Sequence, residues 1–217
     1  MKILYQDPHM VACIKPVGLL SQADSQGGES AVSRLEAAFG RIFPVHRLDK
    51  ETGGVMVFAR TQASAAALSQ AVQENKLQKE YLALLPGMPE TIEGELEDIL
   101  FHDRMKNRTY VVDRLRKGAK PAKLAYRVLE QRDAGVLVRV RLFTGRTHQI
   151  RVQFASRKLP LLGDRKYGSR EKTPMALWAW QLTLPHPKTG EEMTFAALPP
   201  VEDAPWRGFT AWPEENQ

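Results

Sequence analysis

The sequence predicts an α+β fold in which helices flank a mixed, mostly antiparallel sheet. Short segments of β type follow one another along most of the chain, a few helical segments lie between them, and no internal repeat is present. The chain has 217 residues, of which 43% are hydrophobic, and this is enough for one sizeable core. We therefore expect residues 1–217 to form a single domain, with residues 213–217 as a frayed tail.

The first part of the chain alternates strands with helices. Thr61 is placed to cap the second helix, and Leu68 and Val72 lie on the face of that helix that would turn toward the core. The expected elements are strands at residues 2–5, 10–15 and 54–59 and helices at residues 30–39 and 61–75.

The second part is richer in strands and has one helix. We expect that helix over residues 146–157, with Ile150 and Phe154 on its buried face. If it begins at its first residue, Thr147 and Arg151 lie one i, i+4 step apart and share a face. The expected strands lie at residues 80–85, 94–101, 108–113, 122–130 and 135–143.

Positive charge is concentrated in one segment. The chain has 31 Lys and Arg against 25 Asp and Glu, a net charge of +6, and residues 100–124 alone carry eight basic and two acidic residues. The rest of the chain is therefore neutral. Such a cluster is typical of a protein that binds a polyanion, although a solvated hairpin face has the same composition. The basic residues are Arg104, Lys106, Arg108, Arg114, Arg116, Lys117, Lys120 and Lys123.

Other features of the composition exclude several classes of protein. No apolar run approaches the roughly 18 residues that cross a bilayer, and the N-terminus MKILYQDPHM lacks the apolar stretch of a secretory signal. We therefore expect a soluble, cytoplasmic protein without a membrane partner. The single cysteine, Cys13, excludes a disulfide framework and a cysteine-based zinc site, and we expect no metal.

The segment His46-Arg47-Leu48-Asp49 places one carboxylate beside two side chains that can carry positive charge. It lies in a polar connection ahead of the strand at residues 54–59, where a scaffold can present a reactive group. Taken alone, this pattern is more typical of a surface turn with local salt bridges.

A second segment, residues 144–151 (TGRTHQIR), places basic side chains at the start of the expected helix. Cations at this position oppose the helix dipole, and this arrangement favours a bound anion. Taken alone, the segment is a basic helix terminus on the surface.

Taken together and in order, these segments resemble the RluA-type family of RNA pseudouridine synthases. The likeness extends toward the C-terminus through Leu184-x-His186-Pro187-x-x-Gly190 and so covers nearly the whole chain. The matching blocks are Lys15-Pro16-x-Gly18-Leu19-Leu20-Ser21, His46-Arg47-Leu48-Asp49-x-x-Thr52-x-Gly54, Lys79-x-Tyr81-x-Ala83, Thr144-Gly145-Arg146-x-His148-Gln149-Ile150-Arg151 and Gly163-Asp164-x-x-Tyr167-Gly168.

The resemblance implies a catalytic domain with a central cleft, and an isomerase that converts uridine in ribosomal or transfer RNA to pseudouridine. The reaction oxidises nothing and transfers no group to a second molecule, so we expect neither a cofactor nor a metal. The partner would be an RNA stem-loop, and we expect a monomer. Because the N-terminus before the first matching block is short, we expect no S4-type RNA-binding domain of the kind that many relatives carry.

The resemblance also assigns the catalytic residues. Asp49 would be the nucleophile or base, and Arg151 would be its guanidinium partner, because a guanidinium within about 4–6 Å favours an ionised carboxylate. Tyr81 would stack on the uracil. A uridine within an RNA helix cannot reach a recessed acid, so the target nucleotide would be flipped out.

Further residues are candidates for contact with RNA. His46 and Arg47 would lie at the mouth of the site, where Arg47 would contact phosphate or fill the space that the flipped base leaves. The other candidates are Arg146, His148, Arg104, Lys106 and Arg108.

Three positions depart from the family pattern. Gly53 stands where the family usually has Ser, Gln153 where it usually has His, and Trp178 near a position where His is common. The central acid, the tyrosine and the second arginine of residues 144–151 are all present. The departures therefore bear on the choice of RNA and not on the class of reaction.

Two other functions use the same residues. One is a module of this fold that binds RNA without turnover, although binding alone does not call for a carboxylate that faces a polyanion. The other is a nucleoside or glycoside hydrolase, with Glu51 or Asp164 as a second carboxyl group. Release of free uracil would distinguish hydrolysis from isomerisation.

Overall fold

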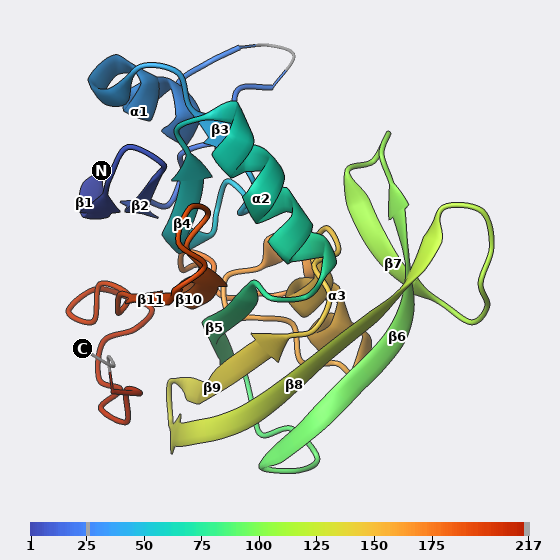
Figure 1. The fold of residues 1–217 in the computed structure, drawn as a ribbon. Coiled ribbons are helices and arrows are strands. Elements are labelled where there is room, and N and C mark those ends of the chain that lie inside the picture. Colours follow the sequence, from blue (N-terminus) through green and yellow to red (C-terminus); the bar gives the residue numbers. More distant parts are fainter. Residues whose placement is uncertain (25–26, 215–217) are drawn as a thin grey trace. The chain divides into compact units, whose positions relative to one another are not determined.

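The computed structural model describes residues 1–24 and 27–214, and the chain divides into two compact units (Figure 1). Unit one contains Met1–Lys79 and Trp178–Pro199, and unit two contains Glu80–Leu177 and Pro200–Pro213. In the expected C-terminal tail, residues 213 and 214 have no regular structure, and residues 215–217 lie outside the described residues. The single domain remains a prediction.

Unit one is built on a sheet with the strand order β1-β2-β4-β10, to which β3 adds at β4 and β11 at β10. The pairs are antiparallel except β4 with β10, which run parallel with Trp178 opposite Gly53. The elements of unit one are β1 (Lys2–Gln6), β2 (Met10–Lys15), α1 (Ala31–Phe39), β3 (Phe43–Pro44), β4 (Gly53–Ala59), α2 (Gln62–Gln73), β10 (Leu177–Pro185) and β11 (Glu192–Ala196).

Each helix of unit one begins directly after a residue whose hydroxyl caps it. The hydroxyl of Ser30 accepts a hydrogen bond from the Ser33 amide at 3.1 Å, and Thr61 caps α2 in the same way through Ser64. Leu68 of α2 is fully buried in the core that β2, β4 and β10 form. The predicted strands, helices and Thr61 cap of this part are therefore confirmed.

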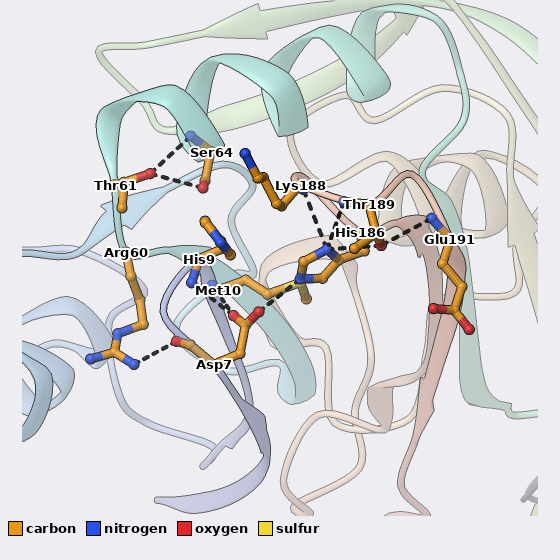
Figure 2. A network of polar contacts seen from close by, with 10 residues as sticks. All are labelled: Asp7, His9, Met10, Arg60, Thr61, Ser64, His186, Lys188, Thr189 and Glu191. Carbon is orange, nitrogen blue, oxygen red and sulfur yellow. Dashed lines mark hydrogen bonds and ion pairs between the residues drawn. The ribbon is translucent and has the colours of Figure 1, made fainter.

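A pair formed by the buried His186 and the partly buried Asp7 ties the β1–β2 turn to the β10–β11 hairpin (Figure 2). The Nδ1 atom of His186 accepts hydrogen bonds from the amides of Lys188 (3.3 Å) and Thr189 (3.1 Å). Its Nε2 therefore carries the proton and donates to Asp7 at 2.8 Å. Burial raises the pKa of Asp7, but bonds from the amides of residues 9 and 10 and from His186 outweigh it and lower the pKa. His186, which lies in the matching block near the C-terminus, therefore has a structural role in unit one.

Unit two is an antiparallel sheet with the strand order β5-β9-β8-β6-β7. In Figure 1, β6 and β8 form a long twisted ribbon. Helix α3 contacts β6 and β7. The elements of unit two are β5 (Gln78–Leu85), β6 (Glu93–Asp103), β7 (Arg108–Val112), β8 (Ala119–Arg132), β9 (Gly135–Leu142), α3 (Gln149–Ser156) and the 3₁₀ turn η1 (Arg165–Tyr167).

The helix of unit two starts later than predicted. It begins at Gln149, because the residue before it, His148, has a left-handed backbone with φ of 54°. Thr147 therefore lies outside the helix, and the prediction that it shares a helical face with Arg151 is wrong. Ile150 and Phe154 are buried, as predicted.

The predicted α+β class with a mixed, mostly antiparallel sheet is confirmed. Across residues 1–24 and 27–214, none of the helices has the length and apolar character needed to cross a membrane.

Candidate functional site

Asp49 lies in a turn between β3 and β4, and its side chain is partly buried. The Thr52 amide closes the turn by donating to the carbonyl of Asp49 at 3.1 Å. On the other side, the buried hydroxyl of Ser21 accepts from the Leu48 amide (3.0 Å) and donates to the Leu48 carbonyl (2.8 Å). The main chain is thus held on both sides of the carboxylate.

A buried lysine lies beneath this turn. The side chain of Lys15 is 0% exposed. Burial lowers its pKa to about 8, although the negative charges of Asp49 and Glu51 act to raise it. Lys15 therefore supplies positive charge close to Asp49 within unit one. Its ammonium donates to three main-chain carbonyls, those of Pro16 (3.0 Å), Leu19 (2.7 Å) and Lys50 (3.3 Å).

The two residues predicted at the mouth of the site differ from one another. The Nε2 atom of His46 accepts a hydrogen bond from the Val57 amide at 3.0 Å, and burial, with a contribution from Lys79, lowers the pKa of His46 to about 3. The ring is therefore neutral at physiological pH and brings no charge to a phosphate. Arg47 is exposed. Their contacts with RNA remain predictions.

Two of the departures from the family pattern form one packing arrangement. A Cβ atom added to Gly53 would lie 2.4 Å from the ring of Trp178. That ring is held in place because its Nε1 donates to the Ala197 carbonyl at 2.7 Å. The indole thus occupies the space that a side chain at position 53 would need.

In unit two, Arg151 forms a buried bidentate ion pair with Asp164. The Nε atom donates to one carboxylate oxygen at 2.7 Å, and Nη2 donates to the other at 2.8 Å. Both side chains are almost fully buried. This fork fixes the plane of the guanidinium, and it engages two of the five N–H donors that an arginine has.

Tyr167 joins several side chains around Arg151. The guanidinium groups of Arg151 and Arg108 each lie 5.2 Å from the centre of its ring. Its hydroxyl accepts from the Thr109 amide at 2.8 Å and lies 2.9 Å from Nδ1 of His148. Burial raises the pKa of Tyr167, so the phenol stays neutral. His148 is only 8% exposed, which favours a structural role, and its contact with RNA remains a prediction.

The side chain of Gln149 fixes the loop that precedes α3. Its carbonyl oxygen accepts from the Thr144 hydroxyl (2.8 Å) and the Arg146 amide (3.0 Å), and its amide donates to the Lys123 carbonyl (3.1 Å). The Nε atom of Arg146 donates to the Pro121 carbonyl at 3.0 Å. This loop therefore sets the position from which α3 carries Arg151.

Tyr81 is buried in β5, next to Glu80, which forms an ion pair with Arg139 of the neighbouring strand β9. Tyr81 and Arg151 thus belong to unit two, and Asp49 belongs to unit one. Each unit presents its own part of the predicted catalytic set.

The predicted RNA-binding residues of the basic segment lie on or near the β6–β7 turn. Arg104 and Lys106 are exposed on that turn, and Arg108 is half-buried against Tyr167. Lys123 is different, because it pairs with Glu95 at 2.7 Å and Glu97 at 2.8 Å, contacts that raise its pKa to about 12. Its charge is therefore offset within the sheet.

Sequence reasoning missed two residues. Asp164 orients Arg151, but nothing in the segment that contains it indicated a partner on α3. Lys15 ends an apolar strand, where a lysine usually turns to solvent, and its position in a matching block was the only signal. No three His, Cys, Asp or Glu side chains in the described part of the chain gather where they would hold a metal ion.

Comparisons with known proteins agree with one another. The profile of the family described as RNA pseudouridylate synthase matches residues 9–156. The Dual-specificity RNA pseudouridine synthase RluA of Escherichia coli (strain K12) is 38% identical over 205 residues, which cover 90% of this chain and 91% of that relative. Ribosomal large subunit pseudouridine synthase D of Nitrosomonas europaea is 35% identical over 88% of this chain and 60% of its own length.

Among solved structures, Human RNA Pseudouridylate Synthase Domain Containing 4 matches with a TM-score of 0.76 and 26% identity. The match covers 92% of this chain and 88% of that one. The likeness therefore holds in both sequence and fold.

Proposed function

The chain belongs to the RNA pseudouridylate synthase family, and we propose that it isomerises uridine in structured ribosomal or transfer RNA with Asp49 as the reactive group. Members of the family are isomerases, and so is this enzyme. The observation that carries the proposal is the extent of the family match. Residues 9–156 include Asp49, Tyr81 and Arg151, so all three predicted catalytic residues lie within the matched region.

The reaction needs a carboxylate but no redox partner. The N1–C1′ bond of uridine breaks and a C5–C1′ bond forms, while a proton leaves C5 and a proton is gained at N1, so the RNA keeps its mass. Asp49 acts as the nucleophile or base in this exchange. Two observations support that role. The turn that carries Asp49 is fixed through its main chain, and the positive charge of Lys15 lies close to the carboxylate.

Arg151 is assigned as the guanidinium that favours the ionised form of Asp49. Arginine suits this task because it keeps its charge when it is dehydrated. The bidentate pair with Asp164 supports the assignment, since it orients a buried guanidinium that has more donors than one carboxylate uses.

Tyr81 and Arg47 are assigned to the nucleotide itself. The target uridine leaves the RNA helix, and the ring of Tyr81 stacks on its base and keeps it from diffusing after the glycosidic bond breaks. Arg47, which is exposed on the turn that carries Asp49, contacts phosphate or fills the vacated place in the stack. One relative is named for the large ribosomal subunit, which supports ribosomal RNA as a candidate substrate, and the other is named a dual-specificity RNA pseudouridine synthase.

The test is to map pseudouridine in total RNA from cells with and without this gene, and then to restore it with the purified protein. We expect carbodiimide-dependent primer-extension stops at specific uridines that disappear without the gene, with no free uracil released. Release of uracil would show a hydrolase instead. RNA binding without any new stop would show a module that binds without turnover.

A further inference from the structure

Two loops of unit two present an apolar side chain between two cations. The β6–β7 turn carries Arg104-Met105-Lys106, and the β7–β8 loop carries Arg114-Leu115-Arg116. Met105 is 99% exposed and Leu115 is 65% exposed. Single exposed apolar residues are ordinary. Here, however, the same order of cation, apolar residue and cation occurs on two consecutive loops, and this repetition is typical of a binding surface.

The backbone beneath Met105 is held in one conformation. A side-chain oxygen of Asp103 accepts from the amides of Met105 (3.0 Å) and Lys106 (3.1 Å). Asn107 closes the turn with a left-handed backbone, and the ammonium of Lys166 donates to its carbonyl at 3.0 Å. The exposed methionine therefore lies on an ordered turn, so the backbone of this turn loses less conformational entropy when a partner binds.

Both loops lie at the same end of the sheet in unit two, where β6 ends and β8 begins (Figure 1). Phe101 near the end of β6 pairs with Ala119 at the start of β8, and the guanidinium of Arg116 lies 4.7 Å from the centre of the Phe101 ring. Arg108, which follows the β6–β7 turn, lies over the ring of Tyr167 beside Arg151. The loops are thus connected to the residues around the proposed catalytic arginine.

We propose that Met105 and Leu115 contact unstacked bases of the RNA, while the cations on either side contact phosphates. The inference rests on the proposed function, because it concerns the RNA on which the enzyme acts. Charge complementarity favours a nucleic acid, since the loops carry most of the net charge of the chain. Side chains cannot reach the bases through the deep, narrow major groove of an RNA duplex. Met105 and Leu115 can therefore contact the faces of bases only in loops, bulges or ends, where the bases are unstacked. Apolar side chains are also used as wedges between base steps.

The experiment compares two RNAs, a blunt 20-bp duplex and a hairpin that has the same stem and a seven-nucleotide loop. Binding to each is measured as a function of salt for the wild type and for Met105→Ser/Leu115→Ser. Ile92→Ser is the matched control, because Ile92 is 67% exposed and lies just before β6, at the opposite end of that strand. Arg104→Gln/Lys106→Gln tests the cations. Thermal unfolding confirms that each variant is folded.

We expect the wild type to prefer the hairpin, and the double apolar variant to lose about tenfold or more in affinity for the hairpin alone. Its slope of log K against log salt stays that of the wild type. The charge variant weakens binding to both RNAs and lowers the slope by roughly 0.7 to 0.9 for each lost phosphate contact. Ile92→Ser behaves as the wild type.

An unchanged hairpin preference in Met105→Ser/Leu115→Ser would overturn the inference, and so would a wild type that binds both RNAs equally. The partner of the loops would be a membrane and not RNA if the wild type bound vesicles of anionic lipid and Met105→Ser/Leu115→Ser lost this binding while it kept RNA binding. Pseudouridine formation with an unchanged preference would reject this inference and keep the proposed function. If the double apolar variant lost the hairpin preference but the wild type formed no pseudouridine, this inference would stand and the proposed function would be rejected.

Discussion

The two units hold their charged residues by different means. In unit one, the turn that carries Asp49 is fixed through main-chain bonds and through Ser21 and Lys15, none of which requires the carboxylate of Asp49. In unit two, Arg151 is fixed through its own charge, by a buried pair with Asp164. We therefore expect the main chain of the Asp49 turn to keep its place when the Asp49 side chain is changed, whereas Arg151 and Asp164 contribute to stability through their own side chains.

The largest effect on stability is expected where the buried pair is broken. Asp164→Asn leaves the Arg151 guanidinium buried with a weaker partner, and we expect the free energy of unfolding to fall by about 3–5 kcal/mol, with most activity lost. Urea unfolding and pseudouridine formation measure the two losses. Glu97→Gln, which alters the exposed pair with Lys123, is the control and should cost about 0–1 kcal/mol.

A double variant separates the two roles of this pair. Arg151→Met/Asp164→Leu removes both buried charges, so we expect it to regain most of the stability without any activity. Equal losses from Asp164→Asn and Glu97→Gln would contradict the account of unit two.

The next effect concerns the lysine beneath the Asp49 turn. Folding lowers the pKa of Lys15 from 10.5 to about 8, so between these values the unfolded chain keeps a proton that the folded chain has released. Stability therefore rises with pH across this window, by about 3 kcal/mol in total. Lys15→Met removes that rise, and unfolding curves of both proteins from pH 7 to 11 measure the difference. Parallel curves would show that the ammonium is not dehydrated by folding.

The smallest of these effects tests the packing of Gly53 against Trp178. Gly53→Ser forces a side chain into the indole ring, and we expect a loss of about 1–3 kcal/mol, as for overpacked cores. In Gly53→Ser/Trp178→His the smaller ring makes room, so part of the loss returns. Thermal unfolding of the three proteins provides the measurement. A single variant as stable as the wild type would show that the two departures are independent.

How much of this could be predicted from the sequence depends on the range of each interaction. Strands and caps follow from local pattern, so the Thr61 cap and the burial of Ile150 were predicted correctly. The start of α3 was not, because no local pattern indicates the left-handed backbone of His148, whose ring contacts Tyr167, a residue distant in the sequence. The matching blocks gave the predicted catalytic residues.

The supporting residues escaped prediction for the same physical reason. Asp164 acts through a side chain on α3, and Trp178 acts across a parallel strand pair, so each role exists only once the chain has folded. Lys15 looked like the polar end of a strand until its three carbonyl partners were known.

The most direct measurement is single-turnover pseudouridine formation by Asp49→Asn, with RNA affinity determined on the same preparation. Glu51→Gln, an exposed carboxylate of the same turn, is the matched control. We expect Asp49→Asn to be folded and to bind RNA within about threefold of the wild type, because the main chain holds the turn, and to form no pseudouridine. Glu51→Gln should retain activity. Product formation by Asp49→Asn at a rate near that of the wild type would contradict the central role of this carboxylate.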